Sequence, residues 1–97
     1  MHVLSAIPTF IRVAECGSFS AVAREFGTTQ PNISKQIAAL EAHLGVRLFS
    51  RTTRQVRLTE EGLSYFRFAT KIQEAITEAD ASVGKAKKTP TGLVRIS

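Results

Sequence analysis

Apolar side chains recur at helical spacing along the first sixteen residues of the chain. The recurring positions, separated by three or four residues, are Leu4, Ile7, Ile11 and Ala14. This spacing predicts an amphipathic helix that ends at Cys16, before Gly17. The start of the helix stays open, because Pro8 would fit the first turn of a helix capped by Ser5 but would kink a helix that begins near His2.

Two further patterns predict a pair of short helices joined at Gly27. Ser18 is suited to cap the first of them and Thr29 the second. The second helix carries its apolar stripe at Ile33, Ile37, Leu40 and Leu44. A small residue at Ala23, a glycine at the turn and a branched anchor at Ile33 are what a helix-turn-helix requires, with an ordinary helical hairpin as the alternative.

The face of this second helix opposite its apolar stripe is a candidate for reading DNA. Its beginning offers hydrogen-bonding groups and its end offers Ala38 and Ala42, so the helix could lie close to a major groove. The candidate contacts are Thr29, Gln30, Pro31, Asn32, Ser34 and Lys35. The alternative is a solvated face, although such a face usually carries Glu and Lys rather than alanines.

Beyond the helix pair the pattern predicts a two-stranded hairpin. Short apolar runs at 48–49 and 56–58 flank the polar, basic segment 50–55. A basic hairpin in this place is in the position of a wing, whose arginines can enter a narrow minor groove, whereas alone it would be a solvated loop. Its candidate contacts are Arg51, Thr52 and Arg54.

A long helix is expected from Glu60 to about residue 88, because Thr59 can cap it and the next proline is Pro90. One stripe of this helix follows a heptad pattern and predicts pairing with a second copy of the chain. Its members are Tyr65, Ala69, Ile72, Ile76, Ala79 and Val83. Packing wholly within one domain is the alternative, and a second face with Leu63, Phe66 and Phe68 could pack on the first helix.

Charge adds a partner class to this picture. The 97 residues carry a net charge of +5, and residues 1–59 hold seven Lys and Arg against three acids. This excess favours a polyanionic partner without separating nucleic acid from an anionic membrane. We expect neither a signal peptide nor a membrane span, and therefore a cytoplasmic protein.

No residues are arranged for catalysis, so the chain is not expected to be an enzyme. The single cysteine, Cys16, excludes an internal disulfide, and we expect it to be a small buried residue of the first helix. His43 is expected at the surface. No spacing suited to a metal or a cofactor occurs.

Four stretches together carry a family resemblance: AECGSFSAVA (14–23), TQPNISKQI (29–37), LEAHLGVRLF (40–49) and RTTRQVRLTEEG (51–62). They resemble the amino-terminal domain of LysR-type transcriptional regulators of bacteria. The resemblance implies a mainly α fold with a winged helix-turn-helix at 1–58 and a linker helix at 59–89 that pairs antiparallel with its twin. Residues 90–97 would then open an absent domain that binds a small-molecule effector.

Carried over position by position, the resemblance makes Gln30, Pro31, Ser34 and Lys35 major-groove and phosphate contacts, and Arg54 the minor-groove arginine of the wing. It also places Ser18 and Ser20 on the DNA backbone. Asn32 departs from the frequent alanine of the family and adds a base contact. Lys35 stands where arginine is common, and lysine cannot contact guanine with two prongs.

The function expected from these residues is sequence-specific binding of double-stranded DNA, at an inverted repeat, by a homodimer that regulates transcription. The alternative is a protein-interaction module that acts through the long helix.

Overall fold

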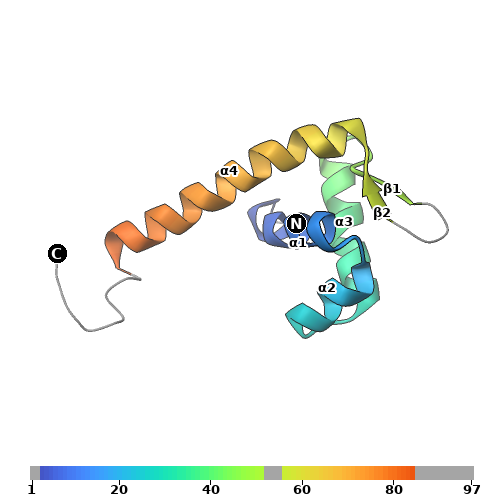
Figure 1. Ribbon diagram of the computed structural model, residues 1–97, viewed down its shortest axis with the longest axis horizontal. Coiled ribbons are helices and arrows are strands. Elements are labelled where there is room, and N and C mark those ends of the chain that lie inside the picture. Colours follow the sequence, from blue (N-terminus) through green and yellow to red (C-terminus); the bar gives the residue numbers. More distant parts are fainter. Residues whose placement is uncertain (1–2, 52–55, 85–97) are drawn as a thin grey trace.

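The computed structural model describes residues 3–51 and 56–84, with Arg51 described by its backbone alone. Within these ranges the chain forms four helices and one two-stranded antiparallel sheet. In chain order they are α1 (Val3–Cys16), α2 (Phe19–Phe26), α3 (Gln30–Leu44), β1 (Phe49–Arg51), β2 (Val56–Leu58) and α4 (Glu60–Val83). Figure 1 shows α1, α2, α3 and the sheet gathered into a head, from which α4 extends as an arm. The expected fold class, a winged helix-turn-helix followed by a long helix, is confirmed.

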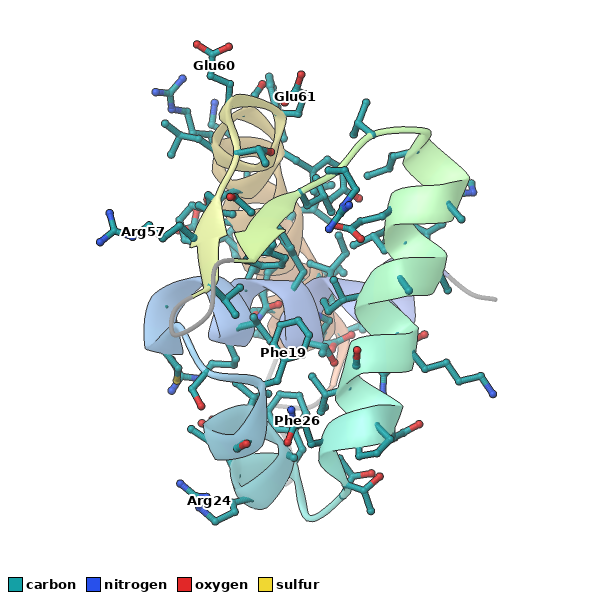
Figure 2. All side chains as sticks on the ribbon, turned by 90° about the vertical axis from the view of Figure 1, so that its right-hand side faces the viewer. Phe19, Arg24, Phe26, Arg57, Glu60 and Glu61 are labelled. Carbon is teal, nitrogen blue, oxygen red and sulfur yellow. The ribbon has the colours of Figure 1, made fainter. Side chains whose placement is uncertain are left out.

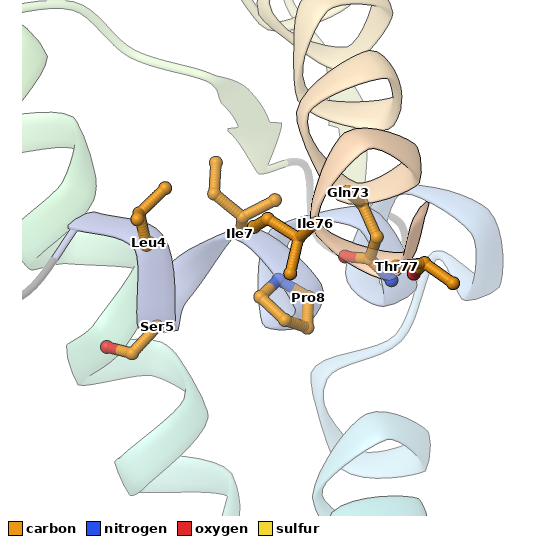
Figure 3. A pocket seen from close by; sticks show the side chains of 7 residues that line it. All are labelled: Leu4, Ser5, Ile7, Pro8, Gln73, Ile76 and Thr77. Atoms are coloured by element: carbon orange, nitrogen blue, oxygen red, sulfur yellow. The ribbon is translucent and has the colours of Figure 1, made fainter. Parts of the chain in front are cut away.

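The start of α1 settles the role of Pro8. The helix already includes Val3 and runs through Pro8, so the prediction that Ser5 caps it is wrong. Pro8 has no N–H to donate to the carbonyl of Leu4, one turn earlier. The proline is exposed, and Figure 3 shows its ring beside Ile76 of α4.

The core of the head is centred on Phe10 of α1, which is fully buried. Its ring lies 5.5 Å from that of Phe49 in β1 and 5.3 Å from that of Tyr65 in α4, centroid to centroid. Such tilted and edge-on pairs add about 0.5–1.5 kcal/mol each beyond the area they bury. One aromatic side chain therefore joins α1 to both the sheet and the long helix. Burial also raises the pKa of the Tyr65 hydroxyl.

The apolar stripe of α3 faces this core as expected. Ile33, Ile37 and Leu40 are completely buried, and Leu44 is half-buried beside them. The spacing of these residues therefore set the orientation of the helix correctly.

The stripe of α4 is divided between two environments. Ala69 is completely buried and Tyr65 half-buried within the head, whereas Ile76 is 40% and Val83 80% exposed. The expectation that Ala69 faces a second copy is thus wrong, because its side chain has no free surface. Phe66 packs on Phe10 as expected, with the ring centroids 6.2 Å apart.

Leu63 and Phe68 do not pack on α1. They are 45% and 61% exposed, respectively. Of the three residues of this predicted second face, only Phe66 packs against the core.

The end of α4 comes earlier than expected. The helix spans 24 residues to Val83, about 36 Å, and the backbone N–H of Gly84 donates to the carbonyl of Asp80. The predicted helix end, at about residue 88, is therefore wrong, because Gly84 already follows the last helical residue. Residues 85–97 lie outside the described ranges.

The carboxylate of Glu41 joins α3 to the chain that leads into the sheet. Its Oε2 accepts hydrogen bonds from the backbone N–H of Leu48, at 2.9 Å, and of Phe49, at 3.2 Å. Glu41 is buried, and the Nε of Arg47 lies 3.7 Å from the same oxygen. Hydrogen bonds to a charged acceptor are about twice as strong as neutral ones, so this contact fixes the entry of the wing.

The same backbone segment is held from the other side by the start of α4. Thr59 donates from its hydroxyl to the carbonyl of Arg47, at 2.6 Å, and from its N–H to the carbonyl of Leu48, at 2.9 Å. The Thr59 hydroxyl also accepts the N–H of Gly62 and so caps α4. A Cβ on Gly62 would lie 2.0 Å from the Leu48 carbonyl oxygen, so only glycine permits this approach.

We predict that Gly62→Ala lowers the free energy of unfolding by about 1–3 kcal/mol, because the added methyl overpacks a backbone contact. Helix propensity alone predicts the opposite sign, a gain of about 1 kcal/mol. Urea unfolding measures the difference, with Ser64→Ala on the exposed side of α4 as control. Equal or higher stability of Gly62→Ala would contradict the close approach.

We predict that Glu41→Ala costs about 2–4 kcal/mol, since it leaves two buried N–H groups without their charged acceptor. Hydrogen exchange should accelerate most at the amides of Leu48 and Phe49. Glu74→Ala, which removes an exposed carboxylate from α4, should change stability by less than about 0.5 kcal/mol. Unchanged exchange at both amides would show that Glu41 does not hold the segment.

Candidate nucleic-acid interface

The turn between α2 and α3 has the geometry that the sequence predicted. Gly27 adopts a left-handed conformation with φ of 69°, which favours glycine. The N–H of Thr28 then donates to the carbonyl of Ala23 at 2.9 Å. Ala23 and Ile33 are both buried where the two helices meet. The helix-turn-helix interpretation is therefore confirmed over the ordinary helical hairpin.

The first turn of α3 presents the predicted contact residues together. Thr29 caps the helix by accepting the N–H of Asn32 at 3.3 Å. The side chains that face solvent here are Gln30, Pro31, Asn32 and Lys35, while Ser34 is half-buried. Among the described residues Lys35 has no ion-pair partner within 4.0 Å, so its charge is available to a ligand.

Two serines at the start of α2 were expected on the DNA backbone, and their surroundings differ. Ser18 is half-buried and caps α2, where its hydroxyl accepts the N–H of Ala21 at 3.1 Å. Ser20 is exposed and donates to the side-chain oxygen of Gln30 at 3.1 Å. The structure thus brings Ser20 to the start of α3, whereas Ser18 serves its own helix.

The wing is described only at its base. Phe49, Ser50 and Arg51 pair with Leu58, Arg57 and Val56, respectively. The strand begins at Phe49, one residue later than expected, and the N–H of Leu48 donates to Glu41. The side chain of Arg51 and all of Thr52 and Arg54 lie outside the described residues.

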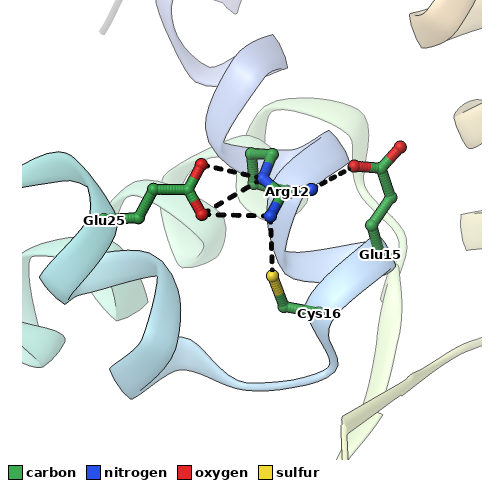
Figure 4. A network of polar contacts seen from close by, with 4 residues as sticks. All are labelled: Arg12, Glu15, Cys16 and Glu25. Atoms are coloured by element: carbon green, nitrogen blue, oxygen red, sulfur yellow. Dashed lines mark hydrogen bonds and ion pairs between the residues drawn. The ribbon is translucent and has the colours of Figure 1, made fainter.

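Arg12 connects α1 to α2 in a way that no sequence pattern indicated. Figure 4 shows its guanidinium between two carboxylates, with Nε and Nη2 each donating to Glu25 at 3.0 Å. A second ion pair joins it to Glu15. Both hydrogen bonds raise the pKa of Arg12 further above its ordinary value, so the charge persists at all relevant pH.

Cys16 lies at the edge of this network and is exposed, so the expectation of a buried cysteine is wrong. It ends α1 just before the chain turns at Gly17, and its sulfur accepts a hydrogen bond from Arg12 at 3.1 Å. His43 is exposed, as expected.

Two exposed arginines of the head were not among the contact residues predicted from the sequence, although Arg57 ends the basic run of the wing. Arg24 lies in the last turn of α2 and Arg57 in β2. Figure 2 shows both side chains extending away from the body of the head. Their position relative to α3 depends on the tertiary fold, which the linear pattern does not contain.

Two other kinds of site, a metal centre and a membrane span, are absent from the part of the chain that is described. Within residues 3–51 and 56–84, no three side chains of His, Cys, Asp or Glu come close enough together to bind a metal ion. Over the same ranges, no helix has the length and apolarity needed to traverse a bilayer.

Known proteins resemble the chain in sequence. Residues 4–63 match the family described as bacterial regulatory helix-turn-helix protein, lysR family. An HTH-type transcriptional repressor of Pseudomonas aeruginosa is 38% identical over 96 residues, which are 99% of this chain and 30% of the repressor. The chain therefore spans about a third of the length of this relative.

Solved structures resemble it as well. The DNA-binding domain of CbnR, in a complex with DNA, is 38% identical with a TM-score of 0.77, over 90% of this chain and 100% of that one. The DNA-binding domain of BenM, in a complex with benA site 1 DNA, is 31% identical with a TM-score of 0.79, over 94% and 100%.

Proposed function

Because the chain belongs to the lysR family of bacterial regulatory helix-turn-helix proteins, we propose that it binds double-stranded DNA through α3 and the wing and regulates transcription. The observation that carries this proposal is the two-sided character of α3. Ile33, Ile37 and Leu40 are completely buried, while the opposite side, from Pro31 to Ala42, is exposed and carries small or hydrogen-bonding side chains. Such a helix fits a major groove, which is read mainly by residues near the start of the helix.

The charge balance of the head supports a polyanionic ligand. Residues 1–59 contain three acids, and each is engaged within the fold. Glu15 and Glu25 pair with Arg12, and Glu41 accepts backbone hydrogen bonds. The exposed basic side chains, including Lys35, Arg24 and Arg47, therefore dominate the field that an approaching phosphate meets.

The proposal is tested by selecting bound duplexes from a random pool with this chain near physiological salt. Enrichment of an inverted repeat supports sequence-specific binding by a dimer, with Arg51, Thr52 and Arg54 of the wing proposed to contact the DNA beside each half-site. Retention without enrichment would restrict the function to backbone binding. No retention would contradict the proposal and favour the interaction module that acts through α4.

We predict that Lys35→Ala makes the negative slope of log K against log salt less steep by about one for each bound copy of the chain, because each copy loses one phosphate contact. Lys35→Arg keeps the positive charge, is the matched control, and should leave the slope unchanged. Fluorescence anisotropy over a salt series measures both. Equal slopes for Lys35→Ala and the parent would remove Lys35 from the phosphate contacts.

We further propose that the chain forms a homodimer through the distal half of α4. Beyond the head, this half carries apolar side chains that are exposed in the described part of the chain: Ile76 at 40%, Val83 at 80%, and Ala79. An apolar hollow of about 600 Å³ lies between α1 and α4 and is lined by Leu4, Ile7, Pro8 and Ile76 among others (Figure 3). Exposed Phe68, half-buried Ile72 and Ala79 continue the surface along α4.

Charge favours an antiparallel arrangement of the two helices. The middle of α4 carries Arg67 and Lys71, whereas its distal half carries Glu74, Glu78 and Asp80. Antiparallel helices bring the basic part of one copy towards the acidic part of the other, and they also oppose the helix dipoles. A parallel pair would place the acidic ends together.

We predict that Ala79→Glu shifts the chain to monomer, because it buries a charge in the proposed seam. Ala81→Glu is a matched control, since Ala81 is also exposed and lies about 200° around the helix from Ala79. Sedimentation equilibrium measures the association of both variants. A dimer that tolerates Ala79→Glu as well as Ala81→Glu would contradict this seam.

We make two further proposals, about a region that binds an effector and about the location of the protein. Like the repressor of Pseudomonas aeruginosa, the regulator would carry a further region, which we propose binds a small-molecule effector. A cytoplasmic location follows if the target is the bacterial chromosome.

A further inference from the structure

Two amide side chains at the start of α3 are each held at one end by a hydroxyl group. The hydroxyl of Ser20, in α2, donates to Oε1 of Gln30 at 3.1 Å. The Nδ2 of Asn32 donates to the hydroxyl of Thr28, in the turn, at 2.9 Å. All of these side chains except the half-buried Thr28 are exposed.

The two hydrogen bonds orient the amides in opposite senses. An amide carries its acceptor oxygen and its donor nitrogen on the same carbon, so holding one atom inward leaves the other free to face a ligand. Gln30 is held by its oxygen and therefore offers the two N–H donors of Nε2. Asn32 is held by its nitrogen and therefore offers the acceptor Oδ1.

Neither hydroxyl is needed to cap a helix. The N-caps of α2 and α3 are Ser18 and Thr29, which accept the N–H groups of Ala21 and Asn32. Ser20 lies two residues after the first cap and Thr28 directly before the second, and both make side-chain contacts instead. Since neither contact completes a helix end, the effect that we assign to each is to favour one orientation of its amide by the net worth of one hydrogen bond.

On the basis of the proposed function, we infer that Ser20 and Thr28 are positioning residues that set which base edges Gln30 and Asn32 accept. An unrestrained glutamine or asparagine pairs with adenine through both amide atoms, oxygen to N6 and nitrogen to N7. The Ser20 contact turns the oxygen of Gln30 towards α2 and leaves a donor, which suits the acceptors of guanine or thymine. The outward acceptor of Asn32 suits the amino group of cytosine or adenine.

This assignment gives Ser20 a role different from a backbone contact. A residue that touches phosphate changes affinity equally for all sequences, whereas a residue that orients an amide changes the preference among bases at one position. The two roles therefore leave different signatures in the same experiment.

The test repeats the selection from a random pool of duplexes with the parent chain and with Ser20→Ala. Gln30→Ala is included to locate the base position that depends on Gln30. At that position the parent should prefer guanine or thymine, and Ser20→Ala should raise the share of adenine relative to them by about fivefold, the worth of one hydrogen bond. Ser20→Thr retains the hydroxyl and should retain the preference of the parent. Ser64→Ala on α4 is the control for the substitution itself.

The second amide is tested in the same way, with Asn32→Ala to locate its position. Thr28→Val removes the hydroxyl at nearly constant shape and should favour adenine over cytosine by about fivefold where the parent accepts both. Thr28→Ser should behave as the parent. Urea unfolding of each variant establishes that the fold is retained.

The possible outcomes separate this inference from the proposed function. If the parent retains no duplex, the proposed function fails and the inference fails with it. If the parent retains duplexes but enriches no sequence, DNA binding stands and the inference alone is overturned. If the parent enriches a site but Ser20→Ala lowers affinity uniformly, Ser20 contacts phosphate and the inference is overturned. Unchanged base preferences in Ser20→Ala and Thr28→Val would overturn it as well.

Discussion

The backbone segment 47–49 is the point on which α3, the wing and α4 all depend. Glu41 of α3 accepts its N–H groups, and Thr59 at the start of α4 donates to its carbonyls. Gly62 allows the helix to approach within a distance that no side chain would tolerate. The buried carboxylate of Glu41 needs the two N–H groups, and Thr59 binds the carbonyls of the same segment, so the three elements cannot shift independently. A reading helix, a basic hairpin and a long arm therefore have one fixed mutual geometry.

Much of this fold follows from local patterns in the sequence. The spacing of Ile33, Ile37 and Leu40 set the buried side of α3, and Gly27 marked the turn, because both depend only on neighbouring residues. The first turn of α3 was likewise identified as the candidate site, since caps and exposed polar residues are local signals. The contribution of Arg12 was not predictable, because Glu25 lies thirteen residues away on another helix.

The misplaced predictions share a physical cause. The start of α1 was left open between a cap at Ser5 and a start near His2, because an interior proline costs helix stability. Burial of Ile7 and Phe10 on either side of Pro8 favours the longer helix. The heptad stripe of α4 was read as one surface, but the head covers its first part and leaves the rest. Periodicity shows that a face is apolar and does not show what covers it.

The division of the α4 stripe couples the distal half of this helix to the orientation of the head. The same side of α4 packs on Phe10 through Tyr65 and, beyond the head, exposes Ile76 and Val83. A continuous helix transmits orientation rigidly over its length, so a partner bound to the distal half would determine where the head points. In the proposed dimer, the spacing of the two reading helices would then be set by α4 and by its anchorage at Gly62, rather than by the flexibility of a linker. Half-site spacing is a geometric property of such dimers. The close contact at Gly62 would thus influence which DNA sites fit, although Gly62 lies in α4 and outside the helix-turn-helix.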